Sequence, residues 1–286
     1  MSIITLTTDM GIEDYYVAAV KGAIYRNLPD VRVIDVSHVV SPFKISQAAY
    51  LVKHCMDEFP NGTVHIIGVD AEPLINFSNP DLSVFPTIVK YKNQYLVGAD
   101  NGVFSLILGN NQPQEVWRME DVLSRPDLMN FPTKNILVPA ACKIISGVDF
   151  ESFASSVDGI KRVTALSPVL DGNTLKGVVT YVDHYGNAIT NINKEDFERV
   201  GKSVPFTIYF RRKEYFIDTI SNGYNEVPEG EKVALFNDSG HLEIAINKGT
   251  PENGGGAGSL LGLRVNEMVR VEFTPRGSHS TIESLF

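Results

Sequence analysis

Residues 3–26 read IITLTTDMGIEDYYVAAVKGAIYR, and this stretch decides how the chain begins to fold. Its first five residues form a short apolar strand that ends in Thr8-Asp9-Met10-Gly11, a polar turn closed by glycine. Residues 15–26 then carry apolar side chains at helical spacing. In open α/β sheets the ligand crevice lies outside the carboxyl ends of the strands, so Asp9 is placed to accept the hydroxyls of a ribose. The alternative is that Asp9 caps the helix that follows.

The same alternation of strand and helix continues along the first half of the chain. A strand at 31–36 precedes a helix that we expect to start at Ser41-Pro42 and to run to about Glu58, and a strand at 63–69 follows. A hairpin occupies residues 87–98. This order predicts an α/β domain over residues 1–168 with a mostly parallel sheet. No GxGxxG fingerprint is present, which favours a nucleoside without phosphates as the ligand.

The pattern changes after about residue 168, where closely spaced short strands replace helical periodicity. These strands predict a small all-β domain over residues 175–273, in the form of a barrel, with a weakly ordered tail at 274–286. The glycine-rich segment 253–258 is either a mobile loop or a segment whose bare backbone approaches a ligand.

A second polar turn interrupts a strand in this domain, within TYVDHYGNAITNI at residues 180–192. Asp183 offers only acceptors, whereas Asn187 offers donors and an acceptor. Together they can hold a ligand that has an ammonium group and a heterocycle edge. The alternative is an ordinary hairpin turn, because Asp, Asn and Gly are common turn formers.

Aspartates follow three of the expected strands in the α/β domain. Asp70-Ala71-Glu72 follows one strand, Asp100-Asn101-Gly102 follows another, and Asp9 follows the first. If these strand ends share an edge, their carboxylates converge and can hold a ribose, stabilise a cation or bind a divalent metal. The alternative is that each aspartate merely begins a turn.

Composition limits the classes of function. The 286 residues include 25 Lys and Arg against 34 Asp and Glu, a net charge of −9, which argues against nucleic acid or an anionic membrane as partner. The two cysteines lie in apolar helical runs and indicate a reducing compartment. The chain has no basic-then-apolar leader and no apolar stretch near 18 residues, so we expect a cytoplasmic protein.

Seven motifs in a specific order make the chain similar to a known family. It resembles the S-adenosylmethionine (SAM) hydroxide adenosyltransferases, or SAM hydrolases, which are related to enzymes that fluorinate or chlorinate the same sulfonium substrate. The resemblance implies an α/β domain, a β-barrel and a homotrimer that holds its small-molecule ligand between the N-domain of one chain and the C-domain of its neighbour. It also implies SAM as substrate and no cofactor or metal. The matching motifs are TTDMG, YYVAAVKGAI, VHIIGVD, GADNG, VPAACKI, VDHYGNAITNI and FNDSGHLEIAINKG.

The resemblance also implies roles for single residues. Asp9 would hold the ribose hydroxyls, Asp183 the amino group of the methionine moiety and Asn187 the adenine edge. Asp238 and Ser239 occupy the positions that lie beside the methionine carboxylate in the family. We also assign Asn101 to the substrate-binding residues.

The catalytic set of the family is incomplete in this chain. Asp70 matches the acid of a water-positioning Asp-Arg-His set, but no Lys or Arg follows it before Lys90, and no histidine lies between His65 and His184. Displacement from a sulfonium requires alignment and desolvation more than acid or base catalysis. We therefore assign Asp70 and Glu72 to the catalytic residues. We expect Lys134 or His184 to supply the positive or proton-accepting group that is missing.

Two other functions are compatible with these residues. The missing Arg and His favour a catalytically silent protein that binds SAM or adenosine. A metal-dependent hydrolase that uses Asp9, Asp70 and Asp100 is the third hypothesis, although no histidine ligands accompany these acids.

Overall fold

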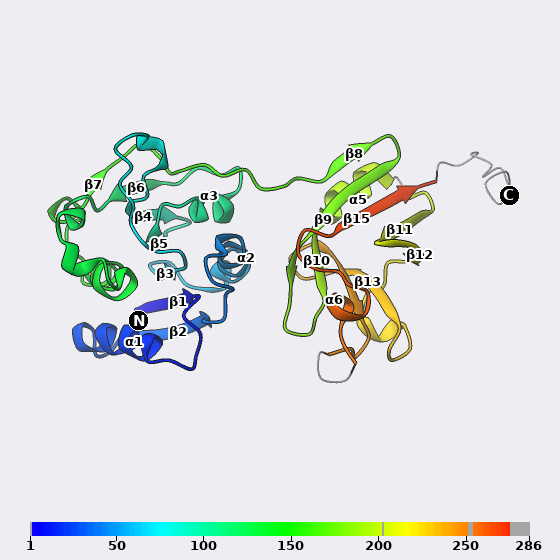
Figure 1. The fold of residues 1–286 in the computed structure, drawn as a ribbon, viewed down its shortest axis with the longest axis horizontal. Helices are drawn as coiled ribbons and strands as arrows, with labels where there is room; N and C mark the ends of the chain where they lie inside the picture. The colour runs from blue at the N-terminus through cyan, green and yellow to red at the C-terminus, as the bar shows by residue number, and fades with distance from the viewer. Residues whose placement is uncertain (1, 202, 251–253, 275–286) are drawn as a thin grey trace. The chain divides into compact units, whose positions relative to one another are not determined.

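The computed structural model describes residues 2–201, 203–250 and 254–274. The chain divides into two compact units, residues 1–165 and 166–286 (Figure 1). Each unit has its own sheet and its own hydrophobic core. Except for Thr274, the tail expected at 274–286 lies outside the described residues.

The first unit alternates strands and helices before it ends in shorter elements. It contains β1 (Ile3–Thr8), α1 (Tyr16–Asn27), β2 (Arg32–Ser37), α2 (Ile45–Cys55), β3 (Val64–Gly68), β4 (Pro86–Tyr91), β5 (Gln94–Ala99), α3 (Val103–Leu108), β6 (Glu115–Arg118), a π-helical turn η5 (Thr133–Leu137), α4 (Val138–Ile145) and β7 (Ser155–Ser156).

The sheet of the first unit is mixed, which corrects the expectation of a mostly parallel sheet. Its strand order is β2-β1-β3-β5-β4-β6-β7. β1 is parallel to β2 and β3, and β3 is parallel to β5, whereas β4, β6 and β7 pair antiparallel. The reversal begins at the turn Lys92-Asn93, where both residues have positive φ angles. A tight hairpin turn of this kind returns the chain antiparallel, because a parallel return needs a crossover connection.

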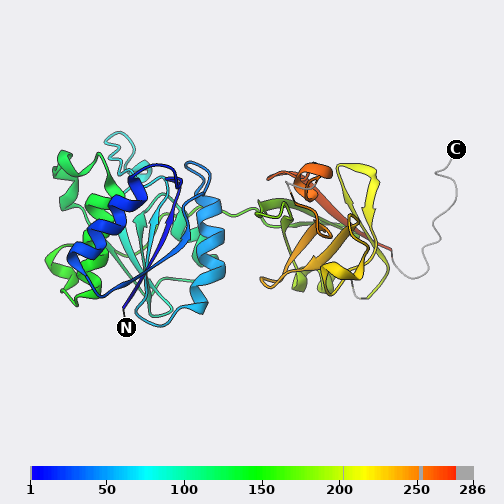
Figure 2. The ribbon, with the colours of Figure 1, turned by 90° about the horizontal axis from the view of Figure 1, so that it is seen from below.

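Helices cover both faces of this sheet (Figure 2). Apolar residues of α1 and α4 pack with Ile4, Leu6 and Ile66 on one face. Residues of α2 and α3 pack with Ile67 and Leu96 on the other face. The central strands are therefore buried on both faces. The helices cover the faces and not the carboxyl ends, where a ligand site can form.

Helix α2 starts at Ile45, four residues later than Ser41, where the sequence predicted its start. Phe43 has a left-handed φ of 63°, which the first turn of a helix does not allow. The N–H of Phe43 donates to Asp9 Oδ2 at 2.9 Å. A contact with a residue distant in sequence therefore delays the helix.

The second unit contains an eight-stranded sheet that is nearly closed and resembles a barrel. The strand order is β12-β11-β15-β9-β10-β14-β13, β8 pairs with β9, and every pair is antiparallel. The strands are β8 (Val169–Asp171), β9 (Thr174–Val182), β10 (Ala188–Asn193), β11 (Phe206–Phe210), β12 (Arg212–Ile217), β13 (Lys232–Phe236), β14 (His241–Ile246) and β15 (Met268–Phe273).

This unit is not all-β as predicted, because it also contains α5 (Lys194–Gly201) and α6 (Ala257–Leu260). Phe197 of α5 packs edge-on against Phe206, Phe236 and Phe273. Phe197, with Val200 packed against the same core, therefore attaches a mostly polar helix to the sheet. So short a helix carries too little periodicity to be recognised in the sequence.

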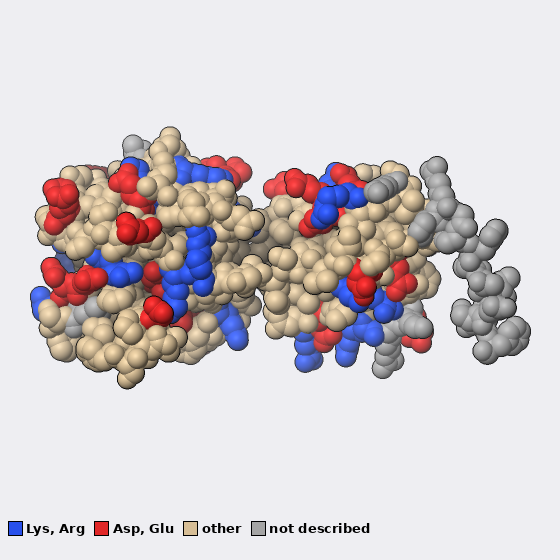
Figure 3. Space-filling model, turned by 90° about the horizontal axis from the view of Figure 1, so that it is seen from above, with Lys and Arg blue, Asp and Glu red and all other residues tan. Residues whose placement is uncertain are grey.

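Two surface observations complete the fold. In the described part of the chain, no helix is both long enough and apolar enough to cross a membrane. Basic and acidic side chains are interspersed on each unit, on the face that Figure 3 shows.

Candidate functional site

Three of the predicted site residues lie along one edge of the first sheet. β1, β3 and β5 are neighbours and run parallel, so their carboxyl ends lie side by side. Asp9 directly follows β1, Asp70 lies two residues beyond β3, and Asn101 lies two residues beyond β5. The expected convergence of strand ends is therefore present at this edge.

Asp9 joins two loops at the carboxyl edge and does not cap helix α1. Its Oδ2 accepts the N–H of Phe43, while Tyr15 occupies the N-cap position of α1 without a side-chain hydrogen bond. The alternative that Asp9 caps the helix is wrong. Gly11 has a φ of 70° and donates its N–H to the carbonyl of His38 at 2.7 Å, so the same two loops are joined a second time.

A buried histidine supports the turn that carries Asp9. His38 Nδ1 lies 2.8 Å from the hydroxyl of Thr8, and His38 Nε2 lies 3.0 Å from Asp35 Oδ1. His38 Nε2 and Asp35 Oδ1 thus lie at ion-pair distance. Burial opposes ionisation of Asp35, but contacts with Lys21 and His38 outweigh it and hold the pKa of this carboxyl below its ordinary value.

Asp70 is exposed, and its backbone is held in an unusual conformation. Its φ is 47°, a left-handed value that costs a residue other than glycine about 1 kcal/mol. The amide of Asn101 donates to the carbonyl of Asp70 at 2.8 Å, and its oxygen accepts the N–H of Val103 at 3.1 Å. Asn101 therefore positions Asp70. Glu72, two residues further along, is exposed.

The carboxylate of Asp100 is buried and forms hydrogen bonds within the protein. It is 4% exposed, and both of its oxygens accept the N–H of Lys161 at 3.0 Å. Burial raises the pKa of Asp100, although the Lys161 hydrogen bond acts in the opposite direction. Among the described residues, no group of three or more His, Cys, Asp or Glu side chains is arranged to hold a metal. Asp9, Asp70 and Asp100 are thus not brought together as a metal-binding cluster.

Thr133 and Lys134 begin the π-helical turn η5, and Lys134 is one of the two residues that we expected to accompany Asp70. Thr133 is buried and packs so closely against Gly68 at the end of β3 that a Cβ there would lie 2.7 Å from it. Lys134 Nζ lies 5.2 Å from the centre of the Phe131 ring. The side chain of Thr133 therefore fills the space beside the end of β3.

In the second unit, Asp183 and Asn187 bond to each other across their turn. Asp183 Oδ1 accepts the N–H of Asn187 at 2.8 Å, and Oδ2 accepts Asn187 Nδ2 at 3.0 Å. The hairpin turn that we considered as an alternative is therefore present. Asn187 is 5% exposed and keeps its side-chain oxygen for another donor, whereas His184 and Tyr185 are exposed.

The glycine-rich segment packs against this turn. Gly258 donates its N–H to the carbonyl of Gly186 at 2.8 Å, and a Cβ on Gly256 would lie 2.4 Å from the carbonyl oxygen of Tyr185. Its bare backbone thus approaches the protein's own turn, which neither of the two sequence alternatives predicted. Asn253, which we included in this segment, lies outside the described residues.

Asp238 and Ser239 lie in the hairpin turn between β13 and β14. Asp238 is exposed and Ser239 is half-buried. The side-chain oxygen of Asn237 accepts the N–H groups of Ser239 and His241, both at 3.1 Å. The local conformation of this turn therefore depends on the orientation of one amide.

Two residues beside these turns were missed in the sequence. Glu243 is 3% exposed and accepts the hydroxyl of Tyr224 at 2.6 Å. Burial, then the bond to Glu243 and then the charge of Asp183 raise the pKa of Tyr224. The signal that could have revealed Glu243 was its charge at the centre of the apolar strand HLEIAI.

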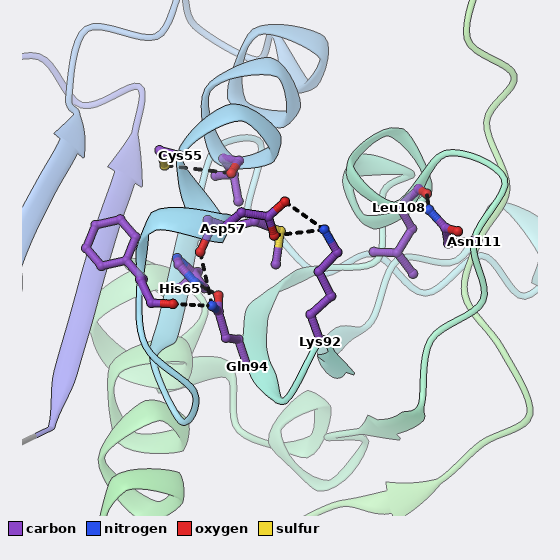
Figure 4. Close-up of polar contacts among 10 residues, drawn as sticks. Cys55, Asp57, His65, Lys92, Gln94, Leu108 and Asn111 are labelled. Atoms are coloured by element: carbon purple, nitrogen blue, oxygen red, sulfur yellow. Dashed lines mark hydrogen bonds and ion pairs between the residues drawn. The ribbon is translucent and has the colours of Figure 1, made fainter. Parts of the chain in front are cut away.

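A different polar network lies in the amino half of the first sheet (Figure 4). Gln94 Nε2 donates to the carbonyls of Met56 and Phe59, so its oxygen accepts His65 Nε2 at 2.7 Å. The other ring nitrogen of His65 accepts the hydroxyl of Thr5 at 2.8 Å. Burial lowers the pKa of His65, although the Gln94 bond opposes this effect. Both ring nitrogens are satisfied, so the network is structural.

Two family models match the chain, one in each unit. The SAM hydroxide adenosyltransferase N-terminal domain matches residues 4–154, and the SAM hydroxide adenosyltransferase C-terminal domain matches residues 177–270. The chain belongs to the SAM hydroxide adenosyltransferase family.

Relatives in this family match most of the length of the chain. The (R)-S-adenosyl-L-methionine hydrolase of Thermus thermophilus is 27% identical, and the match covers 92% of this chain and 97% of the relative. A fluorinase from Actinopolyspora mzabensis is 24% identical, over 86% and 90% of the two chains. An uncharacterised protein from Thermotoga maritima has a similar structure, with a TM-score of 0.80 at 25% identity over 95% and 99% of the chains.

Proposed function

We propose that this protein is a SAM hydrolase that converts S-adenosyl-L-methionine and water to adenosine and L-methionine. The observation that carries the proposal is the carboxyl edge where Asp9, Asp70 and Asn101 follow three adjacent strands, in a chain whose two units both match the family. Hydrolase relatives at full length support the same reaction.

The proposed reaction is a displacement at the ribose C5′ atom. The oxygen of water forms a bond to C5′ while the bond from C5′ to sulfur breaks, and its electron pair stays on the sulfur of methionine. The attacking water loses one proton to solvent or to a base. Because the sulfonium is a good leaving group, the protein mainly has to align water and substrate and to exclude other water.

Residue roles in this proposal follow the chemistry of each side chain. Asp9 keeps Oδ1, which can accept two hydrogen bonds, for the ribose hydroxyls, while Oδ2 accepts the N–H of Phe43. Asp183 and Asn187 bind the amino group and the adenine edge. Asp70 positions the water, because it is an exposed carboxylate whose backbone is held by Asn101.

Five other residues are assigned or considered for supporting roles in the proposal. Glu72 lies beside Asp70 and is the second candidate for holding the water. Lys134 or His184 supplies the group that the family's Arg and His supply elsewhere. Asp238 and Ser239 face the methionine end of the ligand. The mechanism uses no metal or cofactor.

Chromatographic detection of the products tests the proposal. The protein is incubated with SAM, and adenosine and methionine are quantified against a buffer control, because SAM also decays without enzyme. Equal amounts of both products above the control are expected. Incubation in H₂¹⁸O should place the label in the 5′-hydroxyl of adenosine, whereas unlabelled adenosine would contradict attack by water at C5′.

A non-catalytic binder of SAM or adenosine is the second candidate function. The missing Arg and His of the family's catalytic set favour it. In that case ligand at about 100 times its Kd would raise the unfolding free energy by about 2.7 kcal/mol without product formation. Stabilisation without turnover would select this function over the hydrolase.

We also propose a cytoplasmic homotrimer whose ligand site is shared between neighbouring chains. Exposed apolar side chains near the carboxyl edge support association, among them Ile12 at 74%, Phe43 at 72% and Phe77 at 90% exposure. Analytical ultracentrifugation should give three times the chain mass of 31.5 kDa. A monomer that turns over SAM at full rate would contradict a shared site.

A further inference from the structure

Glu243 is a charged residue at the centre of β14, and the proposed reaction does not yet use it. Its register partners are Ile189 on β10 and Leu235 on β13, both of them buried. A carboxylate among such neighbours costs free energy unless hydrogen-bond donors satisfy it. Its position in the sheet therefore depends on specific partners.

Two side chains from separate loops supply these donors. The hydroxyl of Tyr224 donates to Oε1 at 2.6 Å, and Asn237 Nδ2 donates to Oε2 at 3.2 Å. Burial raises the pKa of Glu243, bonds from Tyr224 and Asn237 lower it, and the charge of Asp183 raises it further. The register of the sheet agrees with this effect, because Glu243 pairs with Ile189, which follows the Asp183–Asn187 turn by two residues.

Glu243 determines how the amide of Asn237 is oriented. With Nδ2 directed at the carboxylate, the amide oxygen faces its own turn and accepts the N–H groups of Ser239 and His241. The reversed amide would place its oxygen against a carboxylate and its NH₂ group against two backbone donors. The contact with Glu243 therefore adds side-chain support to a turn that backbone hydrogen bonds between Asn237, Gly240 and His241 also hold.

The other oxygen of Glu243 accepts the hydroxyl of Tyr224. The tyrosine is 42% exposed, and its pKa responds to the charge of Asp183 as well as to Glu243. In the sheet, Glu243 pairs with Ile189, two residues beyond Asn187, so the Glu243–Tyr224 pair lies beside the strand that leaves the Asp183–Asn187 turn. Glu243 is therefore hydrogen-bonded to the Asp238–Ser239 turn through Asn237 and lies in register beside the strand that leaves the other turn.

We propose that Glu243 is a positioning residue for ligand binding. It contacts no substrate atom and acts through Asn237 and Tyr224, which keep the Asp238–Ser239 turn and the Asp183 turn in their binding conformation. This inference rests on the proposed function, because its ligand is SAM.

Three variants separate positioning from folding. Glu243→Leu removes both hydrogen bonds, Glu243→Gln keeps an acceptor for Asn237 and an amide that Tyr224 can bond, and Tyr224→Phe removes a single donor. Glu272→Gln on β15 and Tyr209→Phe on β11 are matched controls, since they change the same chemical groups in strands that do not pair with β14. KM and kcat for SAM and the Tm are measured for each purified protein.

The expected result is an effect on binding that exceeds the effect on turnover. Glu243→Leu should raise KM about tenfold with kcat changed less than about twofold, because the lost order affects ground-state binding. Glu243→Gln should restore most of the affinity, and Tyr224→Phe should raise KM about threefold. Both controls should keep the wild-type KM.

Several results would overturn the inference. A lowered Tm with unchanged KM in Tyr224→Phe and Glu243→Gln means that Glu243 only supports the fold, and these two mild changes decide the matter even if Glu243→Leu does not fold. A Gln variant as impaired as Leu would mean that charge, not hydrogen bonding, is required. If the wild-type protein neither binds nor cleaves SAM, the proposed function fails as well, whereas an active wild type with unaffected variants refutes only the role of Glu243.

Discussion

Polar side chains at the two ends of the first sheet differ in burial and in how fully they are hydrogen-bonded. In its amino half, His65 lies between Thr5 and Gln94, is fully buried and has both ring nitrogens hydrogen-bonded. At its carboxyl edge, Asp70 is exposed on a left-handed backbone, and Asp9 uses one oxygen within the protein. Satisfied groups stabilise the fold, whereas groups with unused bonding capacity are available to a ligand.

The two buried histidines sharpen this contrast. Each lies within hydrogen-bond distance of a threonine of β1, but the second partner of His65 is an amide and that of His38 is the carboxylate of Asp35. The amide holds a neutral ring in the core. The carboxylate of Asp35 instead adds a charged side chain behind the turn that carries Asp9.

The largest expected effect is the loss of activity in Asp9→Ala. Two charge-assisted hydrogen bonds to ribose hydroxyls would be removed, so kcat/KM for SAM should fall about 1000-fold, or about 4 kcal/mol. Steady-state kinetics measures the fall. Thermal unfolding should change little, because within the protein only the Phe43 contact is lost, and a large fall in Tm would mean that Asp9 is structural.

The opposite result is expected for His65→Leu. The Thr5 hydroxyl and the Gln94 side-chain oxygen would stay buried without the hydrogen bonds to His65. The first unit should therefore lose about 3 kcal/mol of unfolding free energy. Trp117 is the single tryptophan of the chain and is buried in the core of this unit, so its fluorescence in urea reports the loss. KM for SAM should stay unchanged, and a raised KM would place His65 in the ligand site.

Asp70→Asn tests the exposed carboxylate without disturbing its backbone, because asparagine tolerates the left-handed conformation. Loss of the group that positions water should lower kcat about 100-fold while KM and Tm stay near their wild-type values. Glu72→Gln is the matched variant on the neighbouring acid. If Glu72→Gln loses activity and Asp70→Asn keeps it, Glu72 holds the water.

The smallest effect concerns pH. Because burial lowers the pKa of His65 in the folded protein, the unfolded chain binds the proton more readily. The stability from neutral His65 is therefore fully present above its unfolded pKa of about 6.5 and is lost as pH falls through the folded value, by at most about 1.4 kcal/mol per pH unit. Urea titrations of the wild type and His65→Leu between pH 7.5 and about 4.5 measure the difference. If the unfolding free energy of the two proteins depended on pH to the same extent, the lowered pKa of His65 would be contradicted.

Patterns within short segments allowed much of the fold and the site to be predicted. Asp9, Asp70 and Asn101 follow strands that a sequence reading can find, and parallel neighbours bring such ends to one edge. The roles of the neighbouring residues were not predictable in this way. Asn101 reaches back 31 residues to the carbonyl of Asp70, and Phe43 reaches back 34 residues to Asp9.

The sequence by itself determined the two units, the β-α order of the first, the family and the residues that follow its strands, because these depend on local periodicity and motif order. Only the tertiary structure decided that the first sheet is mixed, that Phe43 delays α2 and that Glu243 is hydrogen-bonded to Tyr224 and Asn237. Each of these depends on which distant groups satisfy one another's hydrogen bonds, and a buried donor or acceptor selects its partner by position in space rather than by distance along the chain.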